Sequence, residues 1–258
     1  MAQQVCAMPS TLSIVNNPFV ASCVQFVRRA IAPSCLLCNG PARGELICEG
    51  CDGDLPRLRN VSAQHCDQCA IPITEGNRCG ACLAHTPAYD HVCAPFTYDF
   101  PTDALVQGLK YRGMLAVAPL LGKNIANSMD EQPDVLIPMP LGIARLRERG
   151  FNQAQEIARH IAQAHHTKLL PHACRRVRDT PPQAALPWKE RAKNIRKAFV
   201  CDADFTGQHV GVVDDVMTTG ATLNEIARNL KQAGATRVTG LIATRTLPGK
   251  YRKAAIDV

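Results

Sequence analysis

Two adjacent carboxylates and a group of hydroxyls follow an apolar segment that begins at His209. The carboxylates belong to Asp214 and Asp215, and the residues that come next include Thr218, Thr219, Gly220, Ala221 and Thr222. A turn of this kind directs backbone N–H groups and hydroxyls toward one point, and a helix that starts there adds partial positive charge. The turn therefore predicts a phosphate-binding site. Carboxylates suit neighbouring hydroxyls or a magnesium ion rather than phosphate, so the combination indicates a ribose phosphate.

The residues around the turn predict a strand, the turn itself and then a helix. Residues 209–213 are an apolar run, and apolar side chains recur at helical spacing from Leu223 to Leu230, with Gly234 as the stop. An ordinary strand–turn–helix connection with an acidic patch is the alternative interpretation. Neither the glycine fingerprint of dinucleotide-binding folds nor the lysine pattern of ATP-binding loops is present.

Strands and helices alternate over the second part of the chain. The predicted elements, in order, are a strand over 91–99, helices over 105–109 and 115–128, a strand over 134–138, a helix over 151–164 and strands over 209–213 and 237–244. This alternation is typical of an α/β fold with a parallel sheet, flanking helices and ligands at the carboxyl ends of the strands. Residues 171–187 are rich in proline and arginine without apolar periodicity, which predicts a long exposed loop.

Eight of the 13 cysteines form two copies of the unit C-x2-C-x9-C-x2-C, offset by 31 residues. They are Cys35, Cys38, Cys48 and Cys51 in the first copy, and Cys66, Cys69, Cys79 and Cys82 in the second. Two pairs of thiolates make a tetrahedral zinc site with Zn–S distances of about 2.3 Å, and four sulfur ligands leave no open position, so the zinc should be structural. Sequential pairing would give one zinc per copy, and interleaved pairing is the alternative.

The remaining cysteines bear on the expected compartment. Cys6, Cys23, Cys93, Cys174 and Cys201 stand alone, and we expect them to be small buried hydrophobic residues. The N-terminus lacks the basic segment of a signal peptide, and no apolar run reaches the ~18 residues that a membrane helix needs. We therefore expect a cytoplasmic protein without a membrane span. That compartment disfavours a disulfide framework for the paired cysteines, and their repeated spacing disfavours a redox motif.

A chain of 258 residues, 46% of them hydrophobic, can hold one large and one small domain. We expect an N-terminal segment with a helix over 1–32, a double zinc-binding module over 33–90 and an α/β domain over 91–258. Short cysteine loops bury little apolar surface, so zinc should supply most of the folding free energy of the module. Chelation should then unfold residues 33–90 alone.

A second group of anion ligands follows the strand predicted at 134–138. Arg145 and Arg149 precede Gly150, just before a predicted helix start, an arrangement that suits a second anion. The net charge is +7, and residues 145–197 hold 13 Lys and Arg residues but only 4 Asp and Glu residues. This excess suits a pyrophosphate-bearing substrate or nucleic acid, and a solvated surface with salt bridges is the alternative.

The turn at 214–222 resembles the phosphoribosyl pyrophosphate motif of type I phosphoribosyltransferases, with two apolar residues, two acids, a spacer, Thr-Thr-Gly, a small residue and Thr. Further segments are similar to the ComF family of competence proteins: P-x-P-L at 138–141, R-L-R-E-R-G-F-N-Q at 145–153, T-x-x-Q at 180–183 and R-x-x-N-x-R at 191–196, together with the cysteine repeats. The resemblance covers about residues 33–246. It implies a type I phosphoribosyltransferase-like domain preceded by a zinc-ribbon-like module.

The resemblance also implies roles for individual residues. The threonine-rich turn would hold the 5-phosphate, and Asp214 and Asp215 would bind the ribose hydroxyls. Arg149 would act at the pyrophosphate, helped by Arg145, Gly150, Phe151 and Asn152. A hood over 178–196 would close over the substrate, with family-matching residues Thr180, Gln183, Arg191, Asn194 and Arg196. Lys110, Tyr111 and Arg112 match the family as well, but the sequence does not explain their role.

Two functions agree with these features. The first is a magnesium-dependent phosphoribosyltransferase, in which arginines and magnesium stabilise the departing pyrophosphate while the paired aspartates hold the ribose. The second is a non-catalytic competence protein that binds single-stranded DNA during DNA uptake, together with other proteins of the competence machinery. The basic segment and the zinc module favour nucleic acid, whereas an aromatic content of 5% offers few stacking platforms.

Overall fold

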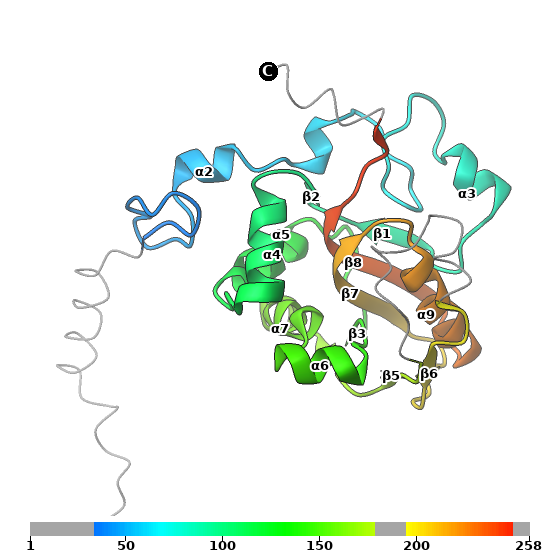
Figure 1. The fold of residues 1–258 in the computed structure, drawn as a ribbon. Coiled ribbons are helices and arrows are strands. Elements are labelled where there is room, and N and C mark those ends of the chain that lie inside the picture. Colours follow the sequence, from blue (N-terminus) through cyan, green and yellow to red (C-terminus); the bar gives the residue numbers. More distant parts are fainter. Residues whose placement is uncertain (1–33, 179–194, 250–258) are drawn as a thin grey trace, which may run out of the picture. The chain divides into compact units, whose positions relative to one another are not determined.

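The computed structural model describes residues 34–178 and 195–249 (Figure 1). The chain divides into two compact units, residues 1–53 and 54–258. The described part of the first compact unit contains the first copy of the cysteine repeat and ends in helix α2 (Glu49–Gly53). The helix expected over 11–32 and most of the expected hood lie outside the described residues.

A parallel sheet forms the centre of the second unit. Its strands follow the order β1 (His91–Cys93), β8 (Arg237–Arg245), β7 (His209–Met217), β3 (Val135–Pro138) and β4 (Lys168–Leu169). Strand β2 (Phe96–Thr97) also pairs with β8, and all of these pairings are parallel. The α/β class with a parallel sheet is therefore confirmed.

Strand β7 is longer than the sequence indicated. The predicted strand stopped at Val213, before the two acids, but the pairing with β8 continues to Met217, opposite Arg245. The prediction was wrong because a run of carboxylates and hydroxyls looks like a turn, while the backbone hydrogen bonds of a central strand hold it extended. Asp214 and Asp215 therefore lie inside β7, close to its carboxyl end.

Helices cover the sheet on both sides (Figure 1). On one side lie α5 (Val117–Asn127) and α7 (Gln153–His165), which pack against each other, with α4 (Thr102–Arg112) beside α5. On the other side lies α9 (Ala221–Gln232). Each buries an apolar stripe, such as Ile157 and Ile161 of α7, both fully buried. The helices predicted over 115–128 and 151–164 are confirmed.

The prediction of an exposed loop over 171–187 was wrong in part, because a short strand lies within it and pairs with a second short strand further along the chain. Strand β5 (Cys174–Arg176) pairs antiparallel with β6 (Phe199–Cys201), outside the main sheet. A three-residue strand carries no detectable period, so only its pairing with a distant segment shows it. Between β5 and β6, the structure describes only residues 177–178 and 195–198.

The same pairing corrects the expectation for two of the single cysteines. Cys174 lies opposite Cys201 in the register, and the two form a disulfide bond. They were expected to be separate small hydrophobic residues, because 27 residues separate them and nothing in the sequence links them. Cys93 is a free and buried thiol, as expected, and Cys6 and Cys23 lie outside the described residues.

The second cysteine unit belongs to the same core as the sheet. Cys66, Cys69, Cys79 and Cys82 are all buried and share one hydrophobic cluster with Tyr89, Met217, Leu223 and Ile226. This shared core explains why the two compact units divide at Gly53 rather than near residue 90, where we had expected the zinc module to end. Among the described residues, no helix has the length and apolarity to cross a membrane.

Candidate functional site

The turn between β7 and α9 has the backbone shape that a phosphate site needs. Gly220 has a φ of 79°, in the left-handed region, and a Cβ added there would lie 2.6 Å from the Met217 side chain and 2.9 Å from the Tyr89 hydroxyl. Only glycine fits such a position. Helix α9 starts directly after it, with the Asn224 N–H donating to the Gly220 carbonyl at 2.8 Å. The expected turn at the N-terminus of a helix is present.

The threonines line the entrance to this helix. Thr218 and Thr219 are partly exposed, and the Thr219 hydroxyl accepts a hydrogen bond from the Ala221 N–H at 3.1 Å. Ala221 and Thr222, the first two residues of α9, are also partly exposed. The first N–H groups of an α-helix have no partner inside the helix, so a ligand oxygen can accept from them.

Asp215 carries the clearest sign of a missing ligand. Its side chain is buried, with the residue 3% exposed, and Oδ1 lies 3.0 Å from the Lys110 Nζ. Oδ2 is buried as well, yet no described residue donates a hydrogen bond to it. A buried carboxylate oxygen without a donor costs free energy on the order of 1–3 kcal/mol. A bound hydroxyl would remove that cost.

Asp214 is held in an unusual protonation state. Burial and, after it, the neighbouring Asp215 carboxylate raise the pKa of its carboxyl to about 8, although the Lys110 ammonium acts in the opposite direction. Its Oδ1 accepts a hydrogen bond from the Asp215 N–H at 2.9 Å, which places the carboxyl beside the end of the strand. Asp215 is thus a buried carboxylate that pairs with Lys110, whereas Asp214 is a carboxyl that ionises near neutral pH.

Lys110 lies at the candidate site, and its contact with Asp215 gives it a partner that the sequence did not indicate. Burial alone would lower its pKa, but the Asp215 carboxylate reverses this and raises the pKa of the ammonium above its ordinary value. The next residue, Tyr111, is exposed, and its ring lies 5.6 Å from the Arg149 guanidinium carbon. The last turn of α4 therefore contacts both halves of the expected site. The signal that could have indicated this ion pair was a lysine next to Leu109, which is buried. A lysine in a buried segment needs an acidic partner.

The second half of the expected site lies at the end of the neighbouring strand. The Met139 N–H, just after β3, donates to the Val213 carbonyl of β7 at 2.8 Å. Helix α6 (Ile143–Arg149) follows, and Gly150, with a φ of 81°, ends it. Parallel strands that are neighbours bring their carboxyl ends to one edge, so this loop lies beside the loop that follows β7.

Side-chain contacts give this second loop a defined shape. The Asn152 side chain caps α7 by accepting from the Ala154 N–H at 3.0 Å, and its Nδ2 donates to the Met139 carbonyl at 3.1 Å. Arg149 donates to the Gln153 side chain. Arg145, Arg149 and Phe151 are partly exposed, and Gly150 is exposed. Arg191, Thr180, Gln183 and Asn194 lie outside the described residues, and Arg196 is exposed near β6.

The two cysteine clusters have the geometry of zinc sites. In each, the four sulfurs lie within 4.8 Å of one another. The Cys38–Cys48 and Cys69–Cys79 sulfur distances are 3.7 and 3.6 Å. Tetrahedral zinc with Zn–S bonds of about 2.3 Å requires sulfurs about 3.8 Å apart. The clusters therefore fit structural zinc, with sequential pairing of the cysteines.

Backbone donors complete each cluster. The Gly40 N–H donates to Cys38 Sγ at 3.4 Å, and the Cys79 N–H donates to Cys66 Sγ at 3.3 Å. Burial would raise the pKa of the Cys66 thiol, but backbone hydrogen bonds from Cys79, Cys69 and Gln68 prevail and lower it to about 7. Such donors stabilise the thiolate that binds a metal.

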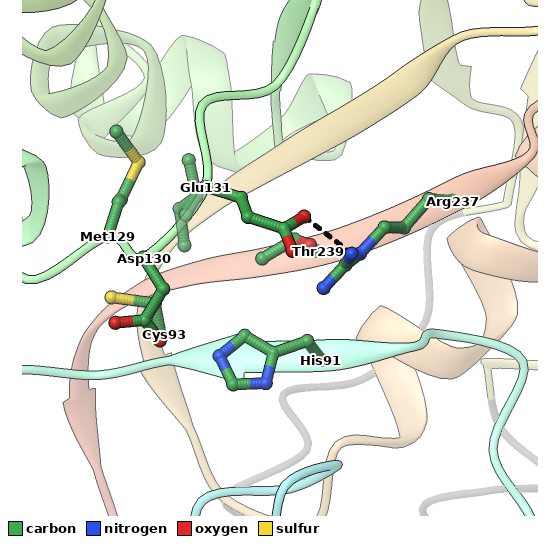
Figure 2. Close-up of a pocket in the computed structure, with 8 residues that line it drawn as sticks. His91, Cys93, Met129, Asp130, Glu131, Arg237 and Thr239 are labelled. Atoms are coloured by element: carbon green, nitrogen blue, oxygen red, sulfur yellow. Dashed lines mark ion pairs between the residues drawn. The ribbon is translucent and has the colours of Figure 1, made fainter.

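A separate pocket opens at the opposite edge of the sheet (Figure 2). It has a volume of about 120 Å³ and lies beside the first residues of β1 and β8, among them His91 and Arg237. The Glu131 carboxylate reaches the Arg237 guanidinium across it at 2.5 Å, as Figure 2 shows. The strand ends that carry the paired aspartates lie at the other edge, so the pocket is separate from the turn expected to bind phosphate.

Known proteins resemble this chain over most of its length. DNA utilization protein YhgH of Escherichia coli O6:H1 is 31% identical over 224 residues, which cover 83% of this chain and 97% of that protein. Competence protein F of Haemophilus influenzae is 28% identical over 219 residues, covering 79% and 93%. Competence protein ComFC of Bacillus subtilis is 25% identical over 203 residues, covering 74% and 80%.

A family model and solved structures match parts of the chain. The model described as a double zinc ribbon domain matches residues 26–83. Glutamine phosphoribosylpyrophosphate (PRPP) amidotransferase from B. subtilis, complexed with ADP and GMP, is 22% identical with a TM-score of 0.35, covering 48% of this chain and 25% of that chain. Purine phosphoribosyltransferase from Pyrococcus horikoshii Ot3 is 15% identical with a TM-score of 0.28, covering 61% and 93%.

The relatives and the zinc ribbon agree with what the sequence suggested. The matched zinc ribbon spans all eight cysteines of the two clusters, and the sequence identity to the relatives extends into the α/β unit as well. From its sequence identity to DNA utilization protein YhgH, at near full length, we conclude that this chain is a member of the ComF family of competence proteins.

Proposed function

We propose that the chain binds phosphoribosyl pyrophosphate and transfers its phosphoribosyl group, and that it does so in the service of DNA uptake. The observation that carries the proposal is the buried Oδ2 of Asp215, which no described residue satisfies and which lies in the strand that leads into the Gly220 turn. A ligand that offers a phosphate to the turn and hydroxyls to the strand end satisfies both. The names of the relatives, which refer to competence and DNA utilization, support the cellular role.

Each part of the ligand has a counterpart in the chain. The 5-phosphate accepts hydrogen bonds from the first N–H groups of α9 and from Thr218 and Thr219. The two ribose hydroxyls donate to Asp214 and to Oδ2 of Asp215. Lys110 pairs with Oδ1 of Asp215 and so restricts rotation of the carboxylate, which leaves Oδ2 as the acceptor assigned to a ribose hydroxyl. The pyrophosphate extends toward Arg149 and Arg145 beside the neighbouring strand.

The reaction follows from these charges. The bond between ribose C1 and the pyrophosphate oxygen breaks, the electron pair leaves with the pyrophosphate, and C1 becomes cationic before the acceptor attacks it. Arg149 and Arg145 stabilise the negative charge on the leaving group, and the carboxylates stabilise the positive charge on the ring. A bound magnesium ion, which prefers oxygen ligands, would neutralise further negative charge on the leaving group. The acceptor is the open part of the proposal.

Release of pyrophosphate is the direct test. The chain, phosphoribosyl pyrophosphate and magnesium are incubated with bases, amines or oligonucleotides, and pyrophosphate is measured against a reaction without acceptor. Acceptor-dependent release identifies both the activity and the acceptor. Tight binding of phosphoribosyl pyrophosphate by calorimetry without any release would leave a binding protein, and the absence of binding would refute the proposal.

The ionisation of Asp214 predicts a pH dependence for ligand binding. Because the pKa of its carboxyl is raised to about 8, most of it is protonated at pH 7 and unable to accept from both hydroxyls. The affinity for ribose 5-phosphate, measured without magnesium, should rise about tenfold between pH 7 and pH 9 as the carboxylate forms. This range lies above the second ionisation of the phosphate, so the ligand's own charge changes little.

Asp214→Asn is the matched control for that profile. The variant cannot ionise at this position, so its affinity should be nearly constant from pH 7 to pH 9. Calorimetry in two buffers of different ionisation enthalpy should also show proton release on binding by the natural chain at pH 7, and none by the variant. A flat profile for the natural chain would show that Asp214 does not accept from the ligand in its ionised form.

Single-stranded DNA binding is the second candidate, and one surface favours it. Basic residues on β5 and beside the pair β5–β6 reach the surface: Arg175, Arg178, Arg196 and Lys197 are all exposed. Arg178 donates to the Arg196 carbonyl at 2.8 Å, which keeps the two ends of the described segments together. Clustered basic side chains of this kind contact phosphates without reading sequence.

The salt dependence of DNA binding tests this second candidate. The logarithm of the affinity for a single-stranded oligonucleotide should fall linearly with the logarithm of the salt concentration, with a slope of about −0.7 for each phosphate contact. Lys197→Ala should weaken binding for every sequence and reduce the slope by about one contact. Lys168→Ala, an exposed lysine on β4, is the control and should change neither. No binding at low salt would remove the candidate.

A further inference from the structure

A buried arginine joins the second cysteine cluster to the phosphate turn. Arg245 is the last residue of β8 and is 4% exposed. Its Nε donates to the Cys69 carbonyl at 2.9 Å, and its Nη1 donates to the Met217 carbonyl at 2.9 Å and to the Thr218 carbonyl. Met217 ends β7 and Thr218 begins the turn. One side chain therefore holds a zinc ligand and the first residues of the turn at fixed positions.

Arg245 is a buried cation, and its positive charge needs compensation from its surroundings. Its partners are carbonyl oxygens, which carry only partial charge, and burial disfavours the guanidinium. Four thiolates and one Zn²⁺ carry a net charge of about −2 by formal count, which is the countercharge that a buried cation needs. Zinc in this cluster therefore stabilises Arg245 in place.

A second set of contacts leads from the cluster to the same turn. The Gln68 side chain, within the second cysteine unit, donates to the Tyr89 carbonyl at 3.0 Å. The Tyr89 hydroxyl lies against Gly220, and the preceding Ala88 N–H donates to the Asn224 side chain of α9 at 2.6 Å. The segment after the cluster thus contacts the turn and the first turns of the helix, independently of Arg245.

We propose that the second zinc site, acting through Arg245, positions the phosphate turn, so that zinc in this site and phosphate in the turn strengthen each other's binding. The first zinc site belongs to the other compact unit and has no such effect. Arg245 is a positioning residue in this scheme, since it does not touch the ligand. The ligand-binding half of the inference rests on the proposed function, whereas the link between zinc and the shape of the turn does not.

Zinc release provides the first test, because coupling between two sites is reciprocal. The full chain, loaded with two zinc ions, is mixed with a chelator and a colorimetric zinc indicator, with and without ribose 5-phosphate and in the absence of magnesium. We expect one of the two zinc ions to leave about tenfold more slowly when the ligand is present, within the usual range of such couplings. The other zinc should leave at an unchanged rate.

Variants assign the protected ion. A chain with Cys48→Ser and Cys51→Ser keeps only the second site, and its single zinc should show the full protection by ribose 5-phosphate. Arg245→Met should abolish the protection, and Arg245→Lys should restore part of it. Arg159→Met, on an exposed arginine of α7 that pairs with Glu156, is the control and should leave it intact. Equal protection of both ions, or of neither while the ligand binds, would overturn the inference.

Hydrogen exchange keeps the test independent of the ligand. In the chain with Cys48→Ser and Cys51→Ser, we expect removal of the remaining zinc to accelerate amide exchange in residues 216–224 at least about tenfold. This readout needs no folded Arg245 variant. If ribose 5-phosphate fails to bind the natural chain, the proposed function fails, yet faster exchange would still support the link between zinc and the turn. Unchanged exchange in 216–224 after zinc loss would refute it.

Discussion

Replacing Asp215 by asparagine should lower the affinity for phosphoribosyl pyrophosphate with magnesium by about 100-fold, or about 3 kcal/mol, as expected for lost hydrogen bonds to a charged acceptor. The unsatisfied Oδ2 of Asp215 is the proposed acceptor of a ribose hydroxyl, and an amide in its place offers only one neutral acceptor oxygen, which binds a hydroxyl more weakly. Calorimetry measures the affinity directly. Asp202→Asn, on an exposed carboxylate beside Arg175, is the matched control and should bind as the natural chain does.

The same substitution affects stability, and the two effects can be separated. Asp215 pairs with Lys110 at 3.0 Å, so Asp215→Asn leaves a mostly buried ammonium without its partner, at a cost of about 3–5 kcal/mol in unfolding free energy. Replacing both partners, by Lys110→Met with Asp215→Leu, should recover most of that stability. The double variant should still fail to bind. A stable double variant with normal affinity would show that the pair is only structural.

Loss of a zinc ligand should have different consequences in the two clusters. Structural zinc contributes about 10–16 kcal/mol of binding free energy in small zinc domains, so removing a ligand affects whatever unit depends on the metal. Cys82→Ser should lower the thermal midpoint of the α/β unit or prevent its folding, because the second cluster shares a core with Tyr89, Met217 and Leu223. Cys48→Ser should leave that midpoint nearly unchanged, because Cys48 belongs to the other compact unit.

Calorimetry and zinc content together check this contrast. Each variant is measured for bound zinc per chain and for its thermal transitions, with both sites loaded beforehand. This expectation replaces the one derived from the cysteine spacing, in which chelation unfolds residues 33–90 as a single module. Equal destabilisation of the α/β unit by Cys48→Ser and Cys82→Ser would show that the two clusters do not divide between the compact units as the core indicates.

Local features were the most predictable from the sequence. The glycine in the turn after β7, the helix that follows it and the helix that Asn152 caps all depend on neighbours within a few residues. The repeated cysteine spacing predicted two four-sulfur clusters, because knuckles of two thiolates close locally and their spacing leaves little freedom. The expected pairing of anion loops on adjacent strands follows from the rule that parallel strands share an edge.

Long-range contacts were not predictable. The sequence placed Lys110 in a motif of unknown role, and only packing of α4 against the end of β7 showed that it pairs with Asp215. Cys174 and Cys201 looked like isolated hydrophobic residues until the antiparallel register set them opposite each other. In both cases the partners are far apart in the chain, and no local pattern encodes which distant side chain fills the facing position.

The residue types and their spacing were sufficient for the α/β class, the double zinc ribbon and the location of the glycine turn before α9, because each arises from hydrogen bonding or metal chemistry within a short segment. The tertiary structure alone decided that β7 extends through the paired aspartates, that Lys110 fixes one of them, and that the second zinc site belongs with the sheet. Those outcomes depend on which surfaces exclude water together, and burial is a property of the whole folded unit.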